Sequence, residues 1–138
     1  MRFSARVQNS TTKHEVELAV GDKTNSLSIA PKTGGPGSSV SGGELLMAAL
    51  ATCYCNDVYR EAASMGIEVT GVDIECEADF PAAGAPGRNI KYTAKITARA
   101  PEDKIRELAV RTDRMAEIQN TVRNAIPVAL NRVDTQTV

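Results

Sequence analysis

The sequence predicts a small α+β protein with antiparallel sheets and a long, buried central helix. Several short segments alternate apolar and polar residues, as half-buried strands do. One long helical pattern, 44–65, begins with almost entirely apolar residues. The strands come in runs rather than alternating with helices, which favours α+β over a parallel α/β sheet. With 138 residues the chain fits one domain, 1–138, and the predicted order is βββ-α-ββ-α-(α)-β.

The first part of the chain predicts a small antiparallel sheet. Residues 2–7 and 14–20 alternate apolar and polar, and the turn-forming sequence QNSTTK separates them. Residues 26–30 (SLSIA) are expected to form a third short strand.

A loop and the start of a helix follow. The segment PKTGGPGSSVSGG is rich in Gly, Pro and Ser, as loops are. At its end Ser41 and Glu44 have the spacing of a capping box. The helix should run to Met65, and Gly66 suits the position that follows a helix. Its first half, LLMAALATCYC, is apolar on every side, which predicts burial on every side.

The second half of the chain predicts a hairpin, helices and a closing strand. Residues 67–80 and 89–99 alternate over most of their length and form a long hairpin with one buried face. Pro101 opens a second helix, and a short helical piece is expected at 117–124. Residues 128–133 are expected to close the fold as a strand.

Composition argues against several classes of protein. The net charge is −1, the aromatic content is 4% and there is no tryptophan, so a nucleic-acid partner is not expected. The first ten residues contain no apolar stretch of the signal-peptide type, and the longest apolar run, 45–55, is too short to span a bilayer. No membrane association is expected, and a cytoplasmic location follows by default.

The cysteines are the residues most able to carry chemistry. Cys53 and Cys55 stand two apart on the predicted helix, so their side chains point to opposite faces and cannot bridge each other. Such a pair is poorly placed to share a metal, and the only histidine, His14, is far away in sequence. No metal and no other cofactor are expected. Cys55 and Cys76 are interpreted as small buried apolar residues.

The stretch GELLMAALATC, which ends at Cys53 and opens a buried helix after a glycine-rich loop, resembles the OsmC/Ohr family. The later order agrees: a long hairpin, a helix that begins APEDK, and a segment that ends NAIPV. The resemblance covers nearly the whole chain. It implies an OsmC-like fold, an intertwined homodimer with its sites at the subunit interface, and, for the peroxidase branch, reduction of hydroperoxides by a reactive cysteine on the central helix.

The resemblance carries over only in part. Cys53 falls on the reactive cysteine, but Ala116 stands where the peroxidase branch has its resolving cysteine, and the surrounding residues read AEIQ. The catalytic glutamate of that branch falls on Gly43, one position before Glu44. Its arginine should come from the first strands, where Arg6 and Lys13 are the nearest cations and neither matches well.

A peroxide-reducing cysteine must ionise, and apolar burial raises the pKa of a thiol above about 8.5. Arg60 and Asp57 share the helical face of Cys53, but Arg60 lies about 10 Å further along the axis, so a cation from a second subunit would be needed. Glu44 has two interpretations: it closes the capping box with Ser41, or it orients a cation near Cys53 as a catalytic residue.

Three hypotheses for the function remain open at this point. The first is a thiol-dependent hydroperoxide reductase in oxidative or osmotic stress defence, with Cys53 and Glu44 as candidate catalytic residues. Cys76 would resolve the oxidised cysteine only if the hairpin packs against this face of the helix, and otherwise an external thiol would do so. The second is a homodimer that has lost peroxidase activity and binds a small hydrophobic molecule in an apolar pocket. The third is a structural or stress-related protein without a dedicated ligand.

Overall fold

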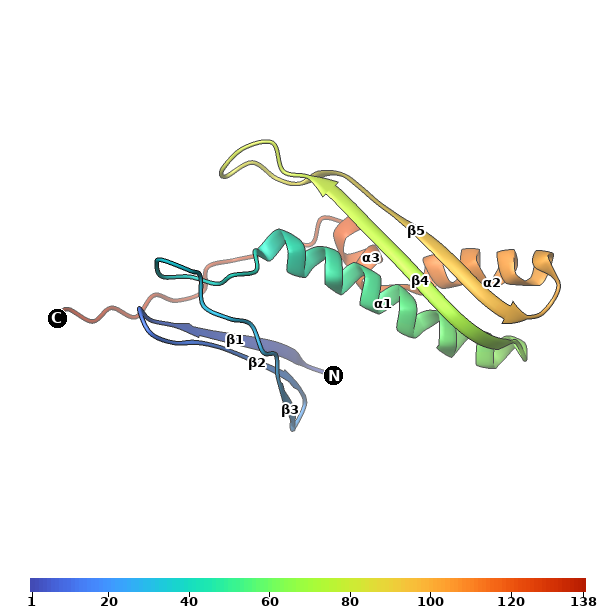
Figure 1. Ribbon diagram of the computed structural model, residues 1–138, viewed down its shortest axis with the longest axis horizontal. Helices are drawn as coiled ribbons and strands as arrows, with labels where there is room; N and C mark the ends of the chain where they lie inside the picture. Colours follow the sequence, from blue (N-terminus) through green and yellow to red (C-terminus); the bar gives the residue numbers. More distant parts are fainter. The chain divides into compact units, whose positions relative to one another are not determined.

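The structure, a computed structural model, describes residues 1–138 and confirms the α+β class. It holds two separate antiparallel sheets, of three and two strands, and three helices. The chain divides into two compact units, Met1–Leu46 and Met47–Val138. Figure 1 labels the helices and strands of both units.

The first unit is built around a three-stranded sheet in the order β1-β2-β3. Strands β1 (Phe3–Asn9) and β2 (His14–Val20) agree with the predicted ranges. The third strand was predicted in the wrong place, because β3 spans Lys23–Ser26 and not 26–30. Its residues, KTNS, are all polar, so they show no alternation of apolar and polar residues that would indicate a strand. The tight turn before them sets the strand instead, by pairing Val20 with Lys23. Gly21 supplies the positive φ (57°) that this tight turn requires.

The β1–β2 ladder collects its apolar residues on one face. Phe3 lies opposite Val20, Ala5 opposite Leu18, and Val7 opposite Val16, and residues directly opposite each other share a face. Much of this face is uncovered within the chain: Phe3 is 70% and Val7 60% exposed.

Helix α1 (Gly42–Met65) begins and ends as predicted, apart from two extra residues at its start. The capping box is formed: the Glu44 N–H donates to Ser41 Oγ (3.2 Å), and the Ser41 N–H donates to Glu44 Oε2 (2.7 Å). At the other end Gly66 has a φ of 66°, and the Ile67 N–H donates to the Ala62 carbonyl. This is the left-handed helix ending for which glycine is preferred.

The second unit packs helices against one face of a long hairpin. Strands β4 (Glu68–Asp79) and β5 (Arg88–Arg99) pair antiparallel, and helix α2 (Glu102–Met115) follows them (Figure 1). The core holds residues from both helices, surrounded by apolar side chains of the hairpin: Tyr54, Val58 and Ala62 of α1 and Leu108 of α2. The prediction of a hairpin with one packed face is confirmed.

The predicted burial of α1 is wrong for the isolated chain. Its fully buried residues are concentrated in the second half, after Leu50, whereas Ala48, Ala49 and Thr52 in the apolar first half are exposed. A short chain has too few other elements to enclose a helix on every side. The apolar first half therefore remains partly uncovered by this chain.

The end of the chain also differs from the prediction. Helix α3 (Glu117–Arg123) forms the expected short helical piece, but 128–133 forms no strand. Val128 and Leu130 are 98% and 86% exposed. These residues pair with no strand in the structure, and an unpaired strand is not stable alone.

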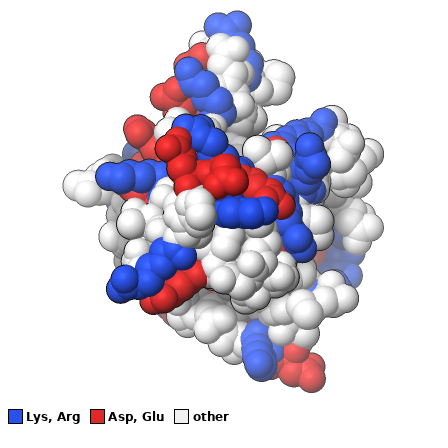
Figure 2. All heavy atoms as spheres, turned by 90° about the vertical axis from the view of Figure 1, so that its right-hand side faces the viewer, with Lys and Arg blue, Asp and Glu red and all other residues white.

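Charges on the surface are mixed rather than segregated. On the face shown in Figure 2, acidic and basic side chains lie next to one another, with neutral surface between them. Ion pairs such as Arg106–Glu102 (2.6 Å) and Lys104–Glu107 (2.8 Å) on α2 are of this kind. Among the helices, none has the length and apolar character needed to cross a membrane.

Candidate functional site

The candidate site is centred on the sulfur of Cys53, in the middle of α1. Asp57 lies four residues later, on the same helical face, and the Cys53 thiol donates to Asp57 Oδ2 at 3.6 Å. Cys53 is half-buried, and Asp57 is buried. Helical spacing alone therefore puts a carboxylate beside the thiol.

Helix α3 brings a second carboxylate to the same sulfur. Ala116, in an extended conformation, ends α2 and precedes α3, so Glu117 is the first residue of α3. A carboxylate is favoured there by the helix dipole. Glu117 Oε2 lies 3.8 Å from the Cys53 sulfur. Both side-chain partners of the sulfur are thus acidic.

Arg60 joins the two carboxylates from the side away from the sulfur. Its Nη1 lies 3.0 Å from Asp57 Oδ1 and 3.3 Å from Glu117 Oε1. The guanidinium therefore uses one oxygen of each carboxylate, and the other oxygen of each faces Cys53. This arrangement orients both acids toward the thiol.

A second layer holds Arg60 in place. Its Nε lies 3.3 Å from Oε1 of Glu61, which is buried, and the other oxygen of Glu61 pairs with Arg111 Nε of α2 at 2.6 Å. Bonding to Arg111 is the main cause that lowers the pKa of Glu61. The chain of charges, from Arg111 through Glu61 to Arg60, ties α1 to α2 next to the site.

The surroundings favour the protonated thiol. Burial is the largest cause that raises the pKa of Cys53, and the charges of Asp57 and Glu117 raise it further. The backbone N–H of Ile118 acts in the opposite direction but does not outweigh them. Burial also raises the pKa of Asp57, against the effect of Arg60. Within one chain, then, Cys53 is not an activated thiolate.

The other predicted residues lie elsewhere. The Glu44 carboxylate is engaged by the backbone N–H and hydroxyl of Ser41, at 2.7 and 2.8 Å, as the capping interpretation expects. A catalytic role for Glu44 stays a prediction. All three cysteines are free, and Cys76 lies on the inward face of β4 opposite Tyr92. Ala116, where the resemblance to the peroxidase branch implies a resolving cysteine, is fully buried.

The sequence did not identify Glu117 because 64 positions separate it from Cys53 and no local spacing connects them. A signal was present, however. The residues AEIQ replace the cysteine-containing pattern of the peroxidase branch, and their second residue is an acid in the first turn of a helix. Helical spacing predicts that Arg60 lies too far along α1 to contact the Cys53 sulfur. In the structure the Arg60 guanidinium does not contact the sulfur and instead pairs with the two carboxylates.

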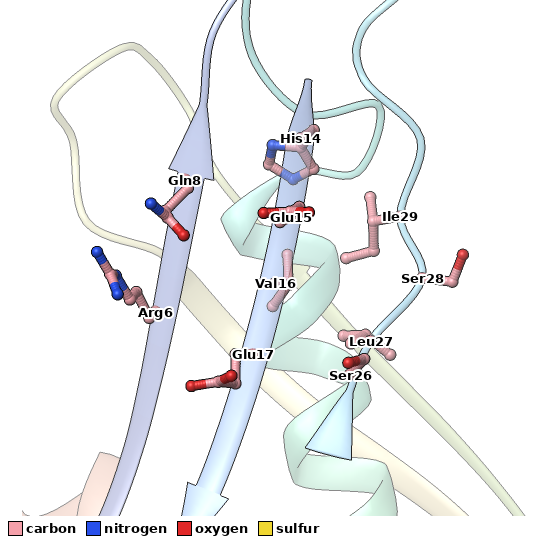
Figure 3. A pocket seen from close by; sticks show the side chains of 10 residues that line it. All are labelled: Arg6, Gln8, His14, Glu15, Val16, Glu17, Ser26, Leu27, Ser28 and Ile29. Atoms are coloured by element: carbon pink, nitrogen blue, oxygen red, sulfur yellow. The ribbon is translucent and has the colours of Figure 1, made fainter. Parts of the chain in front are cut away.

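The first unit has a hollow of its own, of about 430 Å³ (Figure 3). Arg6 and Gln8 of β1, Glu15 and Glu17 of β2, and Ile29 from the segment after β3 contribute to its lining. It contains no cysteine and combines both signs of charge, so it offers no thiol chemistry.

Comparison with known proteins assigns the family. The family model described as OsmC-like protein matches residues 35–131, which include Cys53, Asp57, Arg60 and Glu117. No curated protein sequence matches the chain.

Solved structures share the fold at low sequence identity. An OsmC-like protein from Mycoplasma pneumoniae is 16% identical, with a TM-score of 0.61 over 87% of each chain. The organic hydroperoxide resistance protein OsmC from Legionella pneumophila is 17% identical, with a TM-score of 0.58 over 89% of this chain and 90% of that one.

A third example is the organic hydroperoxide resistance protein OhrB of Bacillus subtilis, which is 16% identical, with a TM-score of 0.53 over 87% of this chain and 90% of the other. The family match covers more than half of the residues, and the similar structures have the same fold. The chain therefore belongs to the OsmC-like protein family.

Proposed function

We propose that this protein is a thiol-dependent hydroperoxide reductase in which Cys53 is the reacting residue and no second cysteine of the chain resolves it. Family membership and the organic hydroperoxide resistance proteins of similar fold support the general activity. The observation that carries the assignment to Cys53 is a half-buried thiol with an oriented carboxylate, Asp57, at 3.6 Å to receive its proton.

The proposed reaction begins with attack of the Cys53 sulfur on one oxygen of the hydroperoxide. The S–O bond forms as the O–O bond breaks, and the thiol proton passes through Asp57 to the departing alkoxide. The products are an alcohol and Cys53 as a sulfenic acid. Asp57 takes the proton as the sulfur attacks, so the thiolate forms only at that moment and the raised pKa of the resting Cys53 thiol does not block this route.

Return to the thiol needs a reductant, because Ala116 replaces the resolving cysteine. One external thiol would attack the sulfenic sulfur, releasing water and leaving a mixed disulfide. A second would then attack that disulfide, releasing an external disulfide and restoring Cys53. Two electrons pass from the two external thiols to the hydroperoxide.

We further propose that the protein works as a homodimer. The apolar face of β1 and β2, the uncovered first half of α1 and the apolar tail at 126–133 all lack cover within one chain. Exposed apolar surface of this extent is typical of subunit interfaces. A partner could also bring to Cys53 the cation that a single chain does not supply.

The alternative is a dimer that binds a small hydrophobic molecule and does no redox chemistry. One observation favours it: burial and two acids raise the pKa of Cys53, which slows any reaction that needs the thiolate.

One experiment separates the two proposals. The double variant Cys55→Ser/Cys76→Ser leaves Cys53 as the only thiol, and its loss is followed after addition of cumene hydroperoxide. The triple variant that also carries Cys53→Ser is the control for reactions elsewhere. The reductase predicts loss well above the rate of free cysteine and recovery on addition of an external thiol. A rate equal to that of free cysteine would reject it in favour of the binding protein.

A further inference from the structure

We propose that Cys53, Asp57 and Glu117 form a binding site for a divalent transition metal ion of the zinc type. This goes beyond reduction of hydroperoxides: a bound ion would occupy the sulfur and Asp57, so the metal-bound form is a separate state of the same site. One possible ligand atom from each of the three residues lies within 4.8 Å of the others. The sequence predicted no metal because Cys53 and Cys55 point to opposite faces and His14 is far away in sequence, whereas the fold adds carboxylates from two helices.

The separations of the ligand atoms suit a tetrahedral ion. With Zn–S of about 2.3 Å and Zn–O of about 2.0–2.2 Å, tetrahedral angles place sulfur and oxygen ligands about 3.5 Å apart. The Cys53 sulfur lies 3.6 Å from Asp57 Oδ2 and 3.8 Å from Glu117 Oε2. The two carboxylate oxygens lie within 4.8 Å of each other, so the exposed Glu117 side chain moves to bring all three atoms to bonding distance of one ion.

Arg60 gives the site a supporting shell. It holds Oδ1 of Asp57 and Oε1 of Glu117, so the oxygens that face the sulfur remain free for an ion. Ligating carboxylates in metal sites are commonly oriented by such outer hydrogen bonds. Glu61 and Arg111 fix Arg60 in turn. The ion would therefore not need to displace the guanidinium.

The net charge of the site and the type of its ligands also suit a divalent transition metal ion. Two carboxylates and Arg60 leave one negative charge when the thiol is neutral. Binding exchanges the Cys53 proton for the metal, and thiolate, two carboxylates, Arg60 and a divalent ion then sum to zero. Three protein ligands leave a fourth position for water or another small ligand, as in catalytic zinc sites. A thiolate with two carboxylates favours zinc or cobalt over magnesium and calcium, which take oxygen ligands only.

The test uses the full chain, reduced and freed of metal. Cobalt(II) is added first as a spectroscopic probe, and zinc is then titrated in competition with a coloured chelator. We expect a near-ultraviolet sulfur-to-cobalt charge-transfer band, one zinc bound per chain, and release of about one proton per zinc near pH 8, where the free thiol is protonated. Glu117→Gln should weaken zinc binding at least tenfold, and Arg60→Gln, which changes only the support, should weaken it about tenfold or more.

Substitution of the other cysteine on the same helix, Cys55, is the matched control for substitution of Cys53. Cys53→Ser should abolish the cobalt charge-transfer band, whereas Cys55→Ser, two residues away on another face, should keep it. Glu117 is exposed, so Glu117→Gln should fold normally, and circular dichroism checks this. The proposal is overturned if the band persists in Cys53→Ser, if Glu117→Gln binds zinc as tightly as the natural chain, or if no cobalt band forms.

Discussion

The side chains around Cys53 determine whether its thiol keeps its proton. Two acids and burial keep its proton in place, although the same acids are well placed to receive that proton during a reaction. Arg60, the nearby cation, pairs with the two carboxylates and does not contact the sulfur. Reactivity at this position depends on the balance among four side chains.

The first prediction concerns this balance. In metal-free protein kept in chelator, Glu117→Gln removes a negative charge 3.8 Å from the sulfur, so the pKa of Cys53 should fall toward its ordinary value. Alkylation of Cys53 by iodoacetamide near pH 8 should then be several-fold faster than in the parent.

The parent for this comparison carries Cys55→Ser and Cys76→Ser. Glu107→Gln, an exposed acid on α2 paired only with Lys104, is the control and should leave the rate unchanged. An unchanged or slower rate in Glu117→Gln would show that this acid does not govern the thiol.

At the scale of elements, the start of α1 depends on the capping box. Ser41→Ala removes the acceptor of the Glu44 N–H and one partner of its carboxylate, and we expect a loss of about 1 kcal/mol in the free energy of unfolding. Urea unfolding followed by circular dichroism measures it. Ser39→Ala, in the same loop but exposed and without a side-chain hydrogen bond, should change stability by less than about 0.5 kcal/mol.

Helix α2 is held by one fully buried leucine. Leu108→Ala would leave a cavity between α1, α2 and the hairpin, and we expect it to cost about 2–5 kcal/mol. Val110→Ala on the same helix, where the side chain is 52% exposed, should cost less than about 1 kcal/mol. Equal losses in denaturant unfolding would contradict the orientation of α2.

Hairpin and α2 are also joined by a polar contact. Tyr92 of β5 donates its hydroxyl to Asp113, which Arg123 also contacts. Burial tends to raise the pKa of Asp113, but these two hydrogen bonds outweigh it and lower the pKa. A carboxylate with a lowered pKa contributes stability above its unfolded pKa, and the contribution is lost as the pH falls through the folded value.

Tyr92→Phe removes this hydrogen bond and should therefore lower the free energy of unfolding by about 1 kcal/mol near pH 7. The expected loss is modest because Asp113 is partly exposed. The deficit relative to the natural chain should begin to shrink below the ordinary pKa of aspartate and be smallest below the lowered folded pKa, where Asp113 is protonated in both proteins. Urea unfolding at several pH values measures this. Tyr59→Phe, at an exposed position of α1, should show no such pH-dependent difference.

For the whole molecule, the main feature is apolar surface that one chain does not cover. The face of β1 and β2 with Phe3 and Val7, the first half of α1 and the tail are separate examples. Burying such surface between two subunits would stabilise both, at about 25 cal/mol for each Å² removed from water.

The corresponding prediction is a change of mass in solution. Light scattering should give twice the chain mass of 14.7 kDa for the natural protein. Phe3→Asp should shift it toward the single-chain mass, because a charge cannot be buried there without a partner. Ser4→Asp, on the opposite face of the same strand, should leave it unchanged. A natural protein of 14.7 kDa would refute the dimer.

Much of the fold could be predicted from pattern alone. Alternation located β1, β2 and the hairpin, and the capping residues located both ends of α1. The pattern of apolar and polar residues did not locate β3, because its pairing is set by the turn at Gly21 and not by apolar residues. The predicted strand at 128–133 was also wrong, because these residues pair with no strand in the structure. The apolar first half of α1 was predicted buried, but one chain does not cover it.

The sequence by itself determined the class of the fold and the helix that carries Cys53, because both depend on residue type and short-range spacing. Only the tertiary structure decided what surrounds the sulfur. Glu117 reaches it across 64 positions through the turn between α2 and α3, and Arg60 aligns both acids from the next turn of α1. Charges act through distance in space, and that distance is set by packing rather than by position along the chain.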